Sequence, residues 1–124
     1  MDVGNKDDML MEIFAQAGVI KPVARTLLFF MNIENGSKVQ AQEIERKMGM
    51  RQPDVSIGTQ ELFKLGLIRR DKLKKEGKGR PLFVYQLAVK PGKILEMMEV
   101  KINKRIAELE GTLSCIMTLK EGTG

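Results

Sequence analysis

The C-terminal part of the sequence constrains the fold more than any other feature. From Pro91 to about Leu119 apolar residues keep a helical period, and a helix of that length would extend roughly 40 Å at 1.5 Å per residue. One small domain cannot cover so long a helix. Apolar residues recur in it at the seven-residue spacing of coiled coils, so we expect it to pair with a second copy in a homodimer. The predicted interface residues are Leu95, Met98, Ile102, Ile106, Leu109, Leu113 and Ile116.

This predicted seam is regular only in its middle. Glu99 and Lys120 interrupt one row of apolar positions at its two ends, and Gly111 costs about 1 kcal/mol relative to Ala inside a helix. A helix that folds back on its own domain is therefore the alternative. We favour dimerisation because two N-terminal helices, over residues 7–17 and from Pro22 to about residue 33, already provide apolar residues for a core.

The middle of the chain predicts two short helices joined by a tight turn. Residues 40–49 form an amphipathic segment that ends at Gly49, where a left-handed backbone is easily adopted. Pro53 suits the first turn of the next helix, in which Val55, Gly58, Thr59 and Leu62 share one side. This arrangement is typical of a helix-turn-helix unit.

The period then changes to that of β-strands. The runs LIRRDKL and PLFVYQL flank the charged, glycine-containing segment KKEGKGR, which predicts a β-hairpin with a solvated tip. Phe83, Tyr85 and Leu87 alternate on one face of the second run, and we expect that face to point toward the helices. The order of elements predicts a mainly α fold with a small β-hairpin wing: a winged helix-turn-helix domain over residues 1–90 and a dimerisation helix over residues 91–120.

The stretch QEIERKMGMRQPDVSIGTQELFKLGLIRR resembles the recognition unit of the MarR, ArsR and TrmB-like transcriptional regulators. The matching features are Gln52-Pro53 at the start of the recognition helix, the pair Val55-Ser56, and the Leu-x-x-x-Gly-Leu-Ile run over residues 62–68. The segment KGRPLFVYQL is similar to the wing of many archaeal-type regulators of this group. The resemblance covers about residues 20 to 90 and implies a winged helix that binds DNA.

Two positions depart from the pattern of these families. Ile57 stands where Arg or Lys is common, so one basic contact to nucleic acid is missing. Thr59 stands on the core side where Leu is usual, and Gly58 beside it lowers helix propensity. We therefore expect a recognition helix that is anchored less firmly than in the relatives.

The charge is concentrated in the segment that contains these motifs. Residues 36–90 hold 13 Lys and Arg against 6 Asp and Glu, whereas residues 1–35 hold 3 against 5 and residues 91–124 hold 5 against 5. All of the positive excess of the chain, +5 at pH 7, thus lies in the middle segment. This distribution favours a partner with negative charge.

The predicted partner is double-stranded DNA, with the helix that starts near Gln52 in the major groove. Gln52 and Ser56 are candidates to contact base edges, and Ile57 to contact a thymine methyl group. The remaining candidates are Pro53 at the helix start, Arg51, Gln60 and Lys64 for backbone phosphates, Lys74, Lys75 and Lys78 in the wing for phosphates, and Arg80 in the wing for the minor groove.

Other classes of function are less favoured. The chain has no His and one Cys, so the usual parts of catalytic sites and metal sites are missing, and we expect no enzyme activity, no cofactor and no metal. The absence of a long apolar span and the acidic N-terminus predict a cytoplasmic protein without membrane contact. A winged-helix protein-interaction module, using Ile57 and Phe63, is the alternative, and RNA binding is a third reading. Neither an operator nor a small-molecule effector is specified by the sequence.

Overall fold

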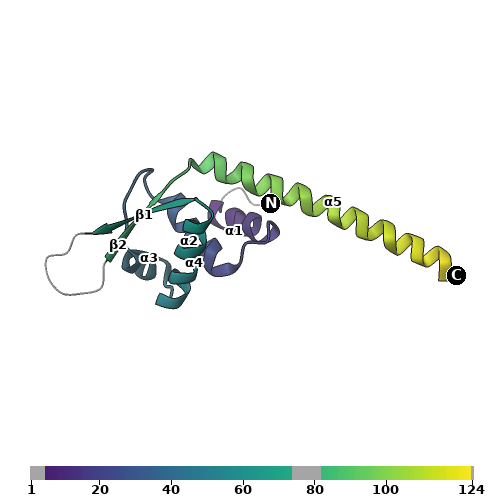
Figure 1. Cartoon of the computed structure of the whole chain (residues 1–124), viewed down its shortest axis with the longest axis horizontal. Coiled ribbons are helices and arrows are strands. Elements are labelled where there is room, and N and C mark those ends of the chain that lie inside the picture. Colours follow the sequence, from purple (N-terminus) through teal and green to yellow (C-terminus); the bar gives the residue numbers. More distant parts are fainter. Residues whose placement is uncertain (1–4, 74–81, 124) are drawn as a thin grey trace.

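The computed structural model describes residues 5–73 and 82–123, and it has the winged-helix architecture (Figure 1). The described elements are α1 (Lys6–Gln16), α2 (Lys21–Asn32), α3 (Ala41–Met48), α4 (Gln52–Lys64), β1 (Ile68–Leu73), β2 (Leu82–Leu87) and α5 (Pro91–Thr123). The predicted order of helices and strands is therefore confirmed. None of the helices in the described part is long and apolar enough to span a membrane.

The turn between α3 and α4 forms as its residues predict. Gly49 ends α3 in the left-handed region, with φ of 60°, and its N–H donates to the carbonyl of Glu45. Pro53 lies in the first turn of α4, where its missing N–H leaves no helical hydrogen bond unmade. The two helices thus form the predicted helix-turn-helix unit.

Helix α2 lies at the centre of the hydrophobic core. Seven of its residues, from Val23 to Phe30, are buried, so the helix is covered on most sides. It packs against α1 through Leu10 and Phe14, and against α4 through Val55 and Leu62. The core therefore holds α4 with one face inward and the other toward solvent.

The contact between α2 and α4 is unusually close at Gly58. A Cβ added there would lie 2.1 Å from the Oγ1 of Thr26, so no larger residue fits without movement. Next to it, Thr59 is 3% exposed and its hydroxyl donates to the carbonyl of Val55 at 2.9 Å. Gly58 thus lowers helix propensity but allows α4 to pack closely against α2. The buried hydroxyl of Thr59 has a hydrogen-bond partner.

The hairpin is joined to the helix-turn-helix unit by a short third strand segment. β1 and β2 pair antiparallel with Ile68 opposite Leu87 and Arg70 opposite Tyr85. Val39, just before α3, forms a bridge with Tyr85, with two N–H···O distances of 2.9 and 2.7 Å. The base of the wing is therefore fixed relative to α3 and α4.

Helix α5 belongs to the domain at its start and leaves it afterwards. Ile94 and Met98 are 0% and 3% exposed and lie in the same core as α2. The prediction of Met98 as a dimer-interface residue is therefore wrong, because its side chain is already covered by its own domain. The boundary at residue 91 is likewise displaced, since the first turns of α5 complete the core.

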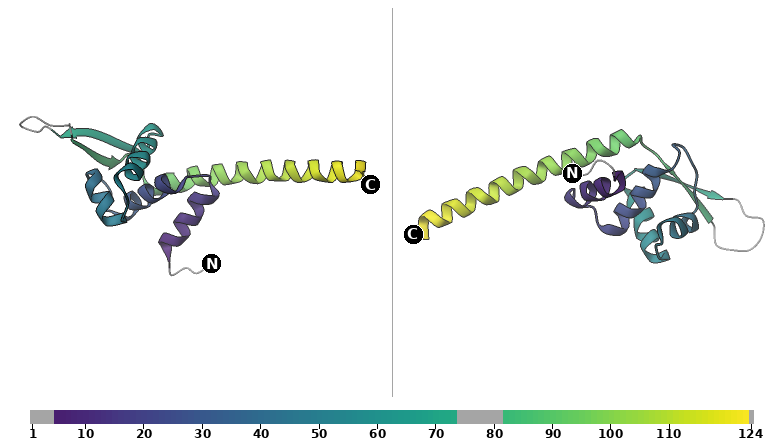
Figure 2. Two further views of the ribbon diagram at one scale, coloured as in Figure 1. Left: turned by 90° about the horizontal axis from the view of Figure 1, so that it is seen from below. Right: turned by 180° about the vertical axis from the view of Figure 1, so that it is seen from behind.

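The rest of α5 projects away from the domain as a straight rod, and its C-terminus and the β-hairpin lie at opposite ends of the molecule (Figure 2). From residue 99 onward every described side chain is exposed except that of Ile102, which is half-buried. Further along α5, the guanidinium of Arg105 donates to the carbonyl of Gln16, at the end of α1, at 2.9 Å. The alternative prediction, in which this helix packs against its own domain, therefore applies only to the first turns of α5, which contain Ile94 and Met98.

Candidate nucleic-acid interface

The outer face of α4 carries the polar residues that the sequence predicts to contact bases. Gln52, Ser56 and Gln60 are exposed and follow one another at four-residue intervals, so they share one side of the helix. The amide of Gln60 donates to the hydroxyl of Ser56 at 3.1 Å. Since the opposite side is buried in the core, this polar stripe lies on the side of α4 that a partner can reach.

The two predicted phosphate-binding cations of α4 lie at opposite ends of the helix. Arg51 is the exposed residue that precedes its first turn, and Lys64 is the exposed last residue. The helix between them is about 20 Å long at 1.5 Å per residue. The structure therefore places these charges at the two ends of the polar stripe.

A groove separates this stripe from the hairpin. It has a volume of about 390 Å³, and Gln52, Ser56 and Gln60 line one side of it. Phe83 and Arg70 of the hairpin line the other side, together with residues at the start of α3. The predicted base-contacting residues are thus brought together with hairpin side chains that lie far away in the sequence.

Arg70 is the functional candidate that no sequence pattern indicated. Its guanidinium carbon lies 4.3 Å from the ring centre of Phe63, in the last turn of α4, and 4.6 Å from that of Phe83 in β2. Phe83 therefore pairs with a cation at the edge of the groove, whereas Tyr85 and Leu87 pack against the core as expected. The strand register puts Arg70 opposite Tyr85, so both side chains lie on the face of the hairpin that points toward the helices.

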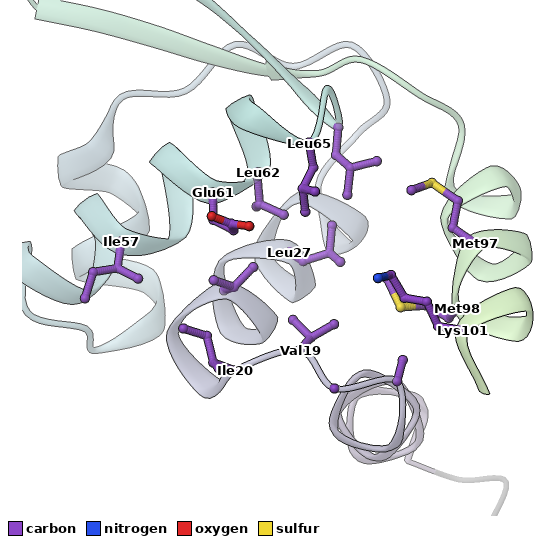
Figure 3. Close-up of a pocket in the computed structure, with 14 residues that line it drawn as sticks. Val19, Ile20, Leu27, Ile57, Glu61, Leu62, Leu65, Met97, Met98 and Lys101 are labelled. Atoms are coloured by element: carbon purple, nitrogen blue, oxygen red, sulfur yellow. The ribbon is translucent and has the colours of Figure 1, made fainter. Parts of the chain in front are cut away.

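Ile57 lies apart from the other predicted contact residues of α4. It is exposed and lines a second cavity of about 380 Å³ between α2, α4 and α5 (Figure 3). It does not line the groove beside Gln52 and Ser56. Leu65, which follows the last residue of α4, lines the same cavity, and Met97 faces it from α5. The structure therefore does not bring Ile57 together with Gln52 and Ser56.

The second cavity is mainly apolar and has two charged side chains at its wall. Glu61 comes from α4, and the amine of Lys101 points toward the cavity from α5 (Figure 3). Ile20, which precedes α2, adds another exposed apolar side chain. The cavity connects the recognition helix with the long helix, because both contribute to its wall.

The wing residues and the residues of the seam complete the predicted set. Lys74, Lys75, Lys78 and Arg80 lie outside the described residues.

On α5, Leu95 and the four seam residues beyond Ile102 are all exposed in the single chain. Those four residues are Ile106, Leu109, Leu113 and Ile116. An isolated helix that exposes so many large apolar side chains has a surface that is suited to a protein partner.

Comparison with known proteins identifies the fold. No protein-family model matches the chain, and no curated protein matches it significantly in sequence. Among solved structures, the chain is similar to a possible transcriptional regulator from Methanosarcina mazei, with a TM-score of 0.66 and 14% identity over 92% of this chain and 93% of that one. It is also similar to a protein from the thermoacidophilic archaeon Sulfolobus tokodaii, with a TM-score of 0.63 and 16% identity over 86% of this chain and 99% of that one.

A third similar structure is that of NadR in complex with 4-hydroxyphenylacetate. Its TM-score is 0.50 and its identity 20%, over 92% of this chain and 78% of that one. At such identities the three similarities show a shared fold. They agree with the winged-helix fold and C-terminal helix that the sequence predicts.

Proposed function

We propose that the protein is a sequence-specific DNA-binding transcriptional regulator that acts as a homodimer and has no catalytic activity. The observation that carries the proposal is the polar stripe of Gln52, Ser56 and Gln60 on α4, exposed beside the groove that separates it from the hairpin. A helix whose apolar side is held by the core and whose polar side is free can enter the major groove. Gln side chains suit adenine there, because the amide both donates and accepts.

The charge of the chain supports a nucleic-acid partner. The positive excess lies entirely in residues 36–90, which include α3, α4 and the hairpin. In the proposal, Arg51 and Lys64 bind phosphates on either side of the major groove, and the wing enters the adjacent minor groove. The name of the Methanosarcina mazei protein as a possible transcriptional regulator agrees with this role.

The proposed dimer follows from the exposed seam of α5. Leu109 and Ile116 are among the apolar side chains that a second copy of the helix would cover. A two-fold dimer would present two copies of α4, and we propose a spacing near one turn of DNA, roughly 34 Å. The operator would then be a palindrome with half-sites about one turn apart.

The proposal is tested by selecting genomic fragments that the purified protein binds and measuring their affinity at several salt concentrations. If the dimer neutralises about 6 to 8 phosphates, log K will fall against log salt with a slope of roughly −5 to −7. Selected fragments should share a two-fold repeat. A protein that enriches no sequence, or whose DNA affinity is independent of salt, is not the regulator proposed here.

A second candidate function is a winged-helix protein-interaction module. Ile20, Ile57 and Leu65 are large apolar residues that stay exposed around one cavity, which is a surface that a protein partner would cover. The two candidates differ in their dependence on the wing. Replacing Lys78 and Arg80 by Ala should weaken DNA binding in a regulator, and unchanged DNA affinity would favour the interaction module.

A further inference from the structure

The groove between α4 and the hairpin holds an arginine with an unusual environment. Among the described residues that line it, Arg70 is the only one with a charged side chain. Its guanidinium contacts the rings of both Phe63 and Phe83, at 4.3 and 4.6 Å from their centres. These two rings come from α4 and β2, so Arg70 connects the recognition helix with the wing.

The two rings restrict the orientation of the guanidinium. A cation over an aromatic face is attracted by the negative charge of the ring, and the planar guanidinium also stacks. Its N–H donors lie in the plane of the group, so a ring that covers a face of the guanidinium leaves the edge available for hydrogen bonds. Within residues 5–73 and 82–123, no hydrogen bond or ion pair involves Arg70. The two rings thus hold the side chain in place, and its donors have no partner among the described residues.

The position of Arg70 along α4 favours a phosphate over a base as its ligand. It contacts the last turn of the helix through Phe63, about 16 Å from Gln52 at 1.5 Å per residue. In helix-turn-helix proteins the N-terminal part of the recognition helix contacts bases. A backbone that crosses between α4 and the hairpin would meet Arg70 on the hairpin side of the groove. Arg binds phosphate oxygens through two parallel hydrogen bonds.

We propose that Arg70 is a DNA-phosphate-binding residue and that Phe63 and Phe83 hold its guanidinium in the orientation that binding requires. This inference rests on the proposed function, because it assigns one more contact to the same interface. It predicts two separable contributions. The charge of Arg70 determines how steeply affinity depends on salt, and its planar shape against the rings determines how tightly the phosphate is bound at a given salt concentration.

The charge is tested with Arg70→Met and a matched control. Arg69 is the neighbouring residue on β1, and it is also exposed, but successive strand residues point to opposite faces of a sheet. Arg69→Met therefore removes the same charge from the face that lies away from the groove. For Arg70→Met we expect about tenfold weaker binding near 0.1 M salt and a salt slope reduced by about 1 per protomer, and for Arg69→Met a change below about twofold with the slope kept.

The role of the rings is tested with Arg70→Lys and Phe83→Leu. Arg70→Lys keeps the charge but loses the planar group, and Phe83→Leu keeps Arg70 but removes one ring. Both variants should keep the wild-type salt slope and bind DNA several-fold more weakly across all sequences. Thermal unfolding of each variant checks that the hairpin is folded, and Arg70→Lys keeps the test valid should Phe83→Leu unfold.

The outcomes separate this inference from the proposed function. If wild-type protein binds DNA with the expected salt dependence but Arg70→Met keeps the same slope, the inference is wrong and the proposed function stands. Equal losses in Arg69→Met and Arg70→Met would also overturn it, since they would reflect general charge. Wild-type affinity in Arg70→Lys would overturn the role of the rings. If the wild-type protein binds no DNA, both proposals fail.

Discussion

Gly58 of α4 and Thr26 of α2 meet so closely that a Cβ on Gly58 would lie 2.1 Å from the Thr26 hydroxyl oxygen and 2.7 Å from its Cβ. The Thr26 hydroxyl cannot easily turn away, because it donates to the carbonyl of Pro22 at 2.8 Å in a completely buried position. The carbonyl of Pro22 itself would be only 3.0 Å from the added atom. The position of the recognition helix on the core therefore depends on the absence of a side chain at residue 58.

Replacing Gly58 by Ala should lower the free energy of unfolding despite the better helix propensity of Ala. We expect a net destabilisation of about 1 to 3 kcal/mol, because the added methyl group forces α4 and α2 apart. Urea unfolding measures the effect. Gly111→Ala is the matched control, since its added Cβ meets nothing within 4 Å, and it should stabilise α5 by up to about 1 kcal/mol. A Gly58→Ala protein as stable as the wild type would show that the helices separate at little cost.

The features that the sequence predicts well are those with local causes. Gly49 ends α3 because a left-handed residue is needed there, and Pro53 starts α4 because its φ suits the first turn. The side of α4 that faces the core follows from the spacing of Val55 and Leu62. Each of these depends on residues within one or two turns, so the pattern alone is sufficient.

The features that it does not predict arise from contacts between distant residues. Arg70 meets Phe63 and Phe83 only because the hairpin folds over the end of α4. The alternation of side chains along a β-strand does not predict which helix the hairpin will cover. Met98 fits the spacing of the α5 seam, but the first turns of that helix serve two surfaces, one facing the core and one facing away. A single apolar period cannot separate these two surfaces.

Ile94 provides a test of whether α5 begins inside the domain. Its side chain is completely buried, so Ile94→Ala should lower the free energy of unfolding by about 2 to 5 kcal/mol, which is the usual cost of such a cavity. Circular dichroism during urea unfolding measures the change. Val100→Ala is the control on the same helix, because its side chain is largely exposed, and it should change stability by less than about 0.5 kcal/mol. Equal effects at the two positions would mean that the start of α5 is not part of the core.

The exposed seam of α5 predicts a dimer that a single charge should disrupt. A Lys at position 109 would place two cations at the centre of an apolar helix pair, so Leu109→Lys should shift sedimentation toward the monomer. We expect at least tenfold weaker dimerisation, about 1.4 kcal/mol or more. Val100→Lys adds the same charge about 200° around the helix from Ile102 and should leave the dimer intact. A wild-type protein that sediments as a monomer contradicts the proposed seam, as does equal disruption by both variants.

Gln52 and Lys64 should affect DNA binding in different ways, because one contacts a base in the proposed complex and the other a phosphate. Gln52→Ala should cost about 1 to 3 kcal/mol on the selected operator, leave non-operator DNA unaffected and keep the salt slope. Lys64→Ala should weaken binding to all sequences alike and reduce the magnitude of the slope by about 1 per protomer. Fluorescence anisotropy on operator and scrambled duplexes at four salt concentrations separates the two effects. Loss of discrimination in Lys64→Ala but not in Gln52→Ala would mean that α4 enters the groove by its C-terminal end, because the residue that distinguishes sequences must lie against the bases.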